Sequence, residues 1–151
     1  MKLDQIVKAE LLKILEETFS KHHGIYTNRN TSLFETLEAI SAEAASVEHG
    51  AERETIAGHV FHVKFYLIVA QEYITNVRTG KTDWDLSWVV KGVTETQWAE
   101  LKDQLRVEYR NLVSFIEGIE DWEKEDYFVG ILGIVAHNAF HLGAIRELNS
   151  V

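Results

Sequence analysis

The chain has 151 residues, a formal net charge of -9 and 46% hydrophobic residues, and it contains neither cysteine nor proline. This length and hydrophobic content predict a single domain, residues 1–151, with a sizeable core. The acidic charge argues against nucleic acid as a partner, because phosphate binding needs clustered lysine and arginine. Without cysteine, disulfides and thiolate ligands are excluded, so a transition metal would need histidine, carboxylate or water ligands.

The hydrophobic residues recur at helical and not at alternating spacing, which predicts an all-α fold. A first helix is expected over 3–20, because three basic residues and then a glycine follow it. Ser32 and Glu35 have the spacing of a capping box, in which each residue accepts a hydrogen bond from the backbone of the other. This pair predicts a shorter helix that begins at Ser32 and continues through residue 44.

The second half of the chain predicts three long helices. The first covers about 55–78 and stops at Gly80. A loop over 81–93 holds two tryptophans and is long enough to be functional. Another capping-box pattern, Thr94 with Gln97, starts the next helix, and the last helix spans about 126–148. Four long helices and one short one predict a helical bundle.

The longest weakly charged stretch, 128–145, is interrupted by two histidines, an asparagine and three glycines. These residues are typical of a central bundle helix and argue against a membrane span. No basic segment followed by an apolar run and a cleavage site opens the chain. We therefore expect a cytoplasmic protein without a membrane partner.

His137 and His141 form an HxxxH pattern within this apolar stretch. On a helix, residues four apart lie on one face about one turn apart, which allows both imidazoles to bind one metal ion. The simpler alternative is that each ring pairs with a backbone carbonyl or a carboxylate, because a buried imidazole without a partner is costly. A third histidine facing the same way would favour the metal.

His59 and His62 lie on the long helix over 55–78. His62 shares a stripe with apolar and aromatic residues and can face the bundle interior: Thr55, Phe65, Tyr66, Val69 and Tyr73. One ligand from this helix and two from the last would leave a fourth coordination position open, as catalytic zinc sites do. The sequence therefore predicts a divalent metal ion, zinc, nickel or iron, bound by His62, His137 and His141.

Four segments together resemble the DinB-like superfamily of bacterial helical bundles, which includes YfiT-like metal-dependent hydrolases. They are Ser32-Leu-Phe-Glu-Thr-Leu-Glu-Ala-Ile-Ser-Ala-Glu, Phe61-His62-Val63, Asp83-Trp84 with Thr94 to Trp98, and Ala136-His137-Asn138-Ala139-Phe140-His141-Leu142-Gly143-Ala144-Ile145. The resemblance implies an antiparallel four-helix bundle, often a homodimer, with a three-histidine metal site.

The family ligands match His62, His137 and His141. His59 matches no ligand position, and we expect it on the helix surface or behind a ligand, because only one of two residues at i,i+3 aims comfortably at a shared centre. The remaining histidines, His22, His23 and His49, are expected to be exposed or to face a helix dipole.

The first functional hypothesis is a metalloenzyme, in which the ion lowers the pKa of a bound water or thiol and so generates a nucleophile. The resemblance implies a small-molecule substrate: transfer involving a low-molecular-weight thiol such as bacillithiol or mycothiol, or hydrolysis. No HExxH and no Glu-x-x-His pattern is present, so the zinc-protease and di-iron layouts are absent. The sequence identifies no general base, and the catalytic residues stay unknown.

The second hypothesis is a non-enzymatic bundle: a metal-stabilised dimer, a stress-response binding protein or a small-molecule carrier. Its pocket would be lined by Trp84, Trp88, Tyr66 and Phe140. In both hypotheses a homodimer is expected, because the second and last long helices carry more apolar residues than one core needs: Phe61, Tyr66, Leu67, Phe128 and Leu132. A phosphotransfer bundle is a third and weaker alternative, because the residues after His59 lack the lysine and glycine that such a site would place there.

Overall fold

The computed structural model describes residues 2–124 and 126–151, and these residues form helices and no strands. The prediction of an all-α fold is confirmed. The elements are α1 (Leu3–Phe19), α2 (Leu33–Glu38), α3 (Ala42–Ala45), α4 (Ile56–Ile74), the 3-10 helix η1 (Trp84–Trp88), α5 (Glu95–Glu117) and α6 (Tyr127–Asn149).

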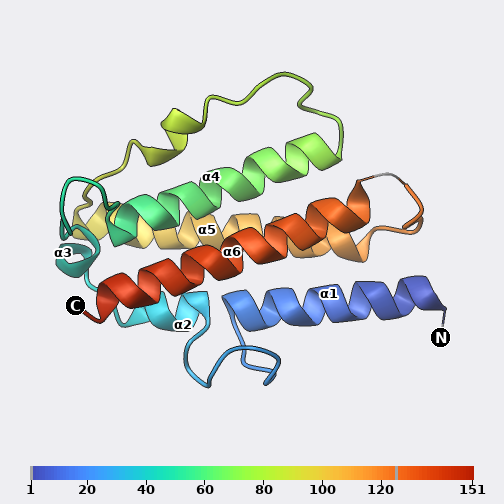
Figure 1. Ribbon diagram of the computed structural model, residues 1–151, viewed down its shortest axis with the longest axis horizontal. Helices are drawn as coiled ribbons and strands as arrows, with labels where there is room; N and C mark the ends of the chain where they lie inside the picture. The colour runs from blue at the N-terminus through green and yellow to red at the C-terminus, as the bar shows by residue number, and fades with distance from the viewer. Residues whose placement is uncertain (1, 125) are drawn as a thin grey trace.

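The four long helices pack lengthwise around one core (Figure 1). Their inward faces contribute fully buried aliphatic side chains such as Leu15, Leu105 and Ile134. Near the end of α1, Phe19 stacks on Tyr109 of α5 with ring centroids 4.7 Å apart. Burial of these apolar stripes is the main force that holds the helices together.

The direction of the helices differs from a simple up-and-down arrangement. Figure 1 shows α1 and α6 running in one direction and α4 and α5 in the other. The antiparallel packing expected from the resemblance is present between α4 and α6, whereas the consecutive helices α4 and α5 are parallel. The reason is that residues 75–94, which we call the return segment, lead the chain back along the molecule before α5 begins (Figure 1).

Both predicted capping boxes are present. At the start of α2, the Ser32 hydroxyl and backbone N–H donate to a Glu35 oxygen at 2.6 and 3.1 Å. At the start of α5, the Thr94 hydroxyl accepts from the Gln97 backbone at 3.2 Å, and the Gln97 side chain accepts from the Thr94 backbone at 2.9 Å. These pairs use backbone donors that the first helical turn leaves without partners.

Three predicted helix boundaries differ from the structure. The helix expected over 32–44 is divided, because the Ser41 hydroxyl accepts from the Ala44 backbone and so caps a new helix. The helix expected over 55–78 ends at Ile74, and Asn76 follows in the left-handed region at φ 58°. The three basic residues expected to close α1 lie beyond its last turn.

Glu17, near the end of α1, has a fully buried side chain. Its carboxylate accepts backbone hydrogen bonds from His23, Ile25, Tyr26 and Thr27 at 2.7 to 3.1 Å, and one from the Thr27 hydroxyl. Burial raises the pKa of this carboxyl, but the hydrogen bonds outweigh it and lower the pKa to about 2. The ionised carboxylate therefore organises the loop that follows α1.

The helix α6 is the one helix among the described residues whose length and composition would allow it to cross a membrane. In this fold it packs along α1 and α4 (Figure 1), and 39% of its most apolar stretch is buried. Length and composition alone are weak evidence for a membrane span, because a core helix can have both.

One face of α6 is exposed and apolar. It carries Phe128, Val129, Leu132 and Phe140, of which Phe140 is 70% exposed. This agrees with part of the apolar surplus expected from the sequence. The inclusion of Leu67 in that surplus is wrong, because its side chain is fully buried in the core and no second molecule can reach it.

Candidate metal site

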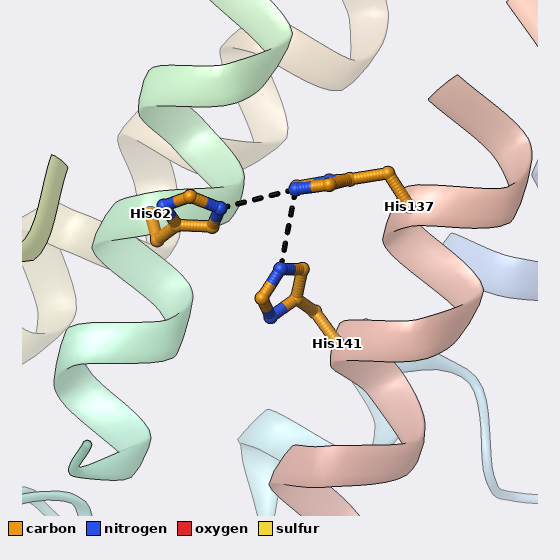
Figure 2. A group of neighbouring side chains, drawn as sticks. All are labelled: His62, His137 and His141. Carbon is orange, nitrogen blue, oxygen red and sulfur yellow. Dashed lines mark hydrogen bonds between the residues drawn. The ribbon is translucent and has the colours of Figure 1, made fainter. Parts of the chain in front are cut away.

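Three histidines converge between α4 and α6. His62 lies in the second turn of α4, and His137 and His141 lie on successive turns of α6. Figure 2 shows the three rings pointing into the space between the two helices. The Nε2 of His137 lies 3.0 Å from Nε2 of His62 and 3.2 Å from Nε2 of His141. The expected convergence of these three residues is therefore present.

The spacing of these nitrogens suits a single small cation. One ring nitrogen from each histidine lies within 4.8 Å of one from each of the others. A tetrahedral zinc ion with ligand distances of about 2.0 to 2.1 Å holds its nitrogens about 3.3 Å apart. Two of the three separations, 3.0 and 3.2 Å, are close to this value, and the three nitrogens lie within 4.8 Å of one another.

The hydrogen bonds around His62 determine which of its nitrogens carries the proton. The Ser87 hydroxyl lies 2.6 Å from the Trp84 carbonyl oxygen, which can only accept, so Ser87 donates its proton there. The Ser87 oxygen, 2.7 Å from Nδ1 of His62, must then accept the hydrogen bond that Nδ1–H donates. Neutral His62 consequently presents the lone pair of Nε2 to the other two histidines.

His59 lies behind His141. Its Nδ1 is 3.0 Å from Nδ1 of His141, on the side of that ring opposite the shared centre. This agrees with the expectation that His59 supports a ligand and is not one itself. The third ring differs, because Nδ1 of His137 is buried and has no hydrogen-bond partner among the described residues.

Aromatic rings from α4 and the return segment cover two of the histidines. Trp88 stacks on His62 with centroids 3.9 Å apart and planes at 9°, and Tyr66 stacks on His137 at 3.5 Å and 11°. Trp84 lies 6.3 Å from His62. The exposed Phe140 contacts only the edge of the cluster, at 5.2 Å from His141. Of the four aromatics expected to line a pocket, Trp88 and Tyr66 therefore cover histidine rings, whereas a pocket lined by all four stays a prediction.

The three rings have low basicity. Burial, with a smaller contribution from the neighbouring histidines, lowers the pKa of His62 to about 4 and that of His141 to about 3, and burial lowers the pKa of His137 to about 4. Above pH 6.5 these histidines are neutral in both the folded and the unfolded chain, so their lowered pKa values do not change the free energy of unfolding. As the pH falls from 6.5 toward these values, the unfolded chain takes up protons that the folded cluster resists, so stability is lost.

The return segment is attached to the helices at both of its ends. Near α4, the Tyr73 hydroxyl donates to the Gly80 carbonyl at 2.6 Å. Near α5, Lys91 pairs with Glu54, and the Ser46 hydroxyl accepts from the Val93 backbone at 2.9 Å. These contacts bring η1 and its Ser87 over the site. Ser87 was not predicted from the sequence, and no spacing rule connects it with a histidine 25 positions earlier.

The other histidines take no part in the cluster. His22, His23 and His49 are partly buried and not fully exposed as expected from the sequence. His23 pairs with Glu16, which compensates for its partial burial. None of the three belongs to the group of residues that could share a metal ion among those the structure describes.

Comparison with models of protein families, with curated proteins and with solved structures finds no match to this chain. The resemblance to the DinB-like superfamily therefore stays a prediction. What can be said about function depends on the geometry of the site.

Proposed function

We propose that the protein is a metalloprotein of DinB-like type, a four-helix bundle in which His62, His137 and His141 bind one divalent cation. One observation carries this proposal: Nε2 of His137 lies 3.0 and 3.2 Å from Nε2 of His62 and His141, the three neutral rings offer nitrogens within 4.8 Å of one another, and His62 faces the others with a lone pair. A single proton on His137 could bridge such nitrogens only weakly. A cation would pair with every lone pair at once.

The proposed activity is that of a transferase or hydrolase acting on a small molecule. A divalent ion bound by three histidines keeps a position for a water or a low-molecular-weight thiol, whose pKa it lowers toward neutrality. The residues of this chain would hold the ion and exclude bulk water, because Trp88 and Tyr66 cover the rings of His62 and His137. Zinc, nickel and iron all suit imidazole ligands.

Metal titration tests this proposal. We expect one equivalent of Zn²⁺ per chain, and Co²⁺ added to the metal-free protein should give the absorption of a four-coordinate ion, which Zn²⁺ then displaces. Addition of 2-mercaptoethanol should produce a sulfur-to-cobalt charge-transfer band, because a thiolate can enter the open position. A chain that binds neither ion would refute the metal site. If the ion binds but its spectrum does not change with thiol or with exchange of water, no coordination position is open. The proposal of an enzymatic activity would then be refuted.

That last outcome would support the second candidate, a metal-stabilised binding protein without catalytic activity. The observation in its favour is the enclosure of the site: His62 and His141 are only 7% and 4% exposed. A saturated, closed site would then serve to hold α4 against α6.

We also propose that two copies associate through the exposed apolar face of α6. This face bears no charged side chain between Tyr127 and Ile145, whereas the chain as a whole carries -9, so two copies would meet with little repulsion there. Sedimentation equilibrium should give a dimer. Val129→Lys, at a position that is 65% exposed, should shift it to a monomer, whereas Leu86→Lys on the return segment should not. A monomeric wild-type protein would exclude this association.

A further inference from the structure

We propose that Ser87 is a positioning residue, which holds His62 in the tautomer that presents Nε2 to a metal ion. The part of this proposal that concerns metal affinity rests on the proposed function, whereas the part that concerns the tautomer does not. Ser87 lies on η1, outside the four long helices, and contacts His62 across 25 positions of sequence.

The first step of the argument is the direction of the Ser87 hydroxyl proton. The turn of η1 places the Trp84 carbonyl 2.6 Å from this hydroxyl, and the carbonyl can only accept. The remaining lone pairs of the serine oxygen are therefore the ones that face Nδ1 of His62 at 2.7 Å. A serine held in this way accepts from Nδ1–H and stabilises one tautomer over the other.

The second step is the burial of this contact. Ser87 is 0% exposed and His62 is nearly buried, so no bulk water can replace the hydroxyl if it is removed. The neighbouring residue, Trp88, stacks on the face of the same ring at 3.9 Å. Two consecutive residues thus define both the plane and the rotation of the His62 imidazole.

The third step is a comparison of the three histidines. The second nitrogen of His141 faces His59, which is partly exposed, so water can substitute for it. The second nitrogen of His137 has no partner among the described residues. The orientation of His62 depends on a buried side chain from another segment. We therefore expect the loss of Ser87 to lower zinc affinity more than the loss of His59 does.

The experiment compares Ser87→Ala with Ser46→Ala. Ser46 anchors the end of the same segment through Val93 and does not touch a histidine, so its variant controls for loosening of the return segment. The ¹⁵N shifts of His62 in the metal-free proteins report its tautomer, and a competition titration gives the Zn²⁺ affinity. Ser87→Thr keeps the hydroxyl and serves as the rescue variant.

We expect wild type, Ser46→Ala and Ser87→Thr to show the Nδ1–H tautomer of His62, and Ser87→Ala to show a mixture of both. Zinc affinity in Ser87→Ala should fall by about 10-fold to 100-fold, as for other partners of metal-bound histidines. An unchanged tautomer in Ser87→Ala, or an equal change in Ser46→Ala, would overturn the proposal. If wild type binds no zinc but the tautomer responds as expected, the proposed function fails and the role of Ser87 in orienting His62 stands.

Discussion

His141→Ala is expected to abolish stoichiometric zinc binding while the protein stays folded. Two histidines, His62 and His137, would remain, and two imidazoles do not retain a labile divalent ion tightly. The fold should persist because the apolar faces of all four long helices are untouched. Metal analysis after gel filtration gives the stoichiometry, and circular dichroism gives the helix content.

His59→Ala is the matched control for this variant, because it removes a histidine that contacts His141 from behind. Its zinc affinity should stay within about tenfold of wild type, the lower end of the effect of an outer partner. The three-histidine assignment would be wrong if His141→Ala kept a full equivalent of metal, or if it lost the metal and turned over an identified substrate at the wild-type rate.

Glu17→Ala is expected to destabilise the fold strongly, although the substitution only removes one carboxylate. The buried carboxylate accepts four backbone N–H groups of the loop after α1. These hydrogen bonds are partly buried, and a donor left without an acceptor costs about 1 to 3 kcal/mol where water cannot replace the carboxylate, so we expect a loss of about 3 kcal/mol in total. Urea denaturation at pH 7 measures it.

The adjacent Glu16→Ala is the control, because its carboxylate is partly exposed and, among the residues that the structure describes, pairs with His23 alone. An exposed pair of this kind contributes at most about 1 kcal/mol. A Glu17→Ala variant as stable as Glu16→Ala would contradict the structural role of the carboxylate.

The pH dependence separates Glu17 from the histidines. The pKa of Glu17 is lowered from 4.5 to about 2, so its contribution is complete above pH 4.5 and is lost as the pH falls toward 2. The difference in stability between wild type and Glu17→Ala should therefore be constant from pH 7 to pH 5 and shrink below that. Protonation of the histidine cluster, between pH 6.5 and 4, affects both proteins equally and cancels from the difference.

The convergence of the three histidines could be predicted from the sequence because its signal is local. His137 and His141 are four apart on a helix, which places both rings on one face, and His62 shares a stripe with core residues. The capping boxes of α2 and α5 are equally local, since each involves residues three apart. In all these cases the helix itself fixes the relation between the side chains.

The features that could not be predicted depend on how the chain returns on itself. Ser87 reaches His62 only because the return segment runs back along α4, and no periodicity encodes that path. Glu17 would be expected in solvent from its residue type, yet a loop closes over it and supplies its hydrogen bonds. Leu67 has the same apolar character as an interface residue, and only packing assigns it to the core.

The common direction of α1 and α6 has a practical consequence for purification. Both helices begin at the same end of the molecule, and α6 continues to the other end, where α4, which carries His62 in its second turn, begins (Figure 1). From His141 to the last residue of α6, Asn149, the helix rises only about 12 Å. A polyhistidine tag attached after Val151 would therefore lie within reach of the site and compete for its metal, whereas a tag that precedes α1 would be held at the opposite end.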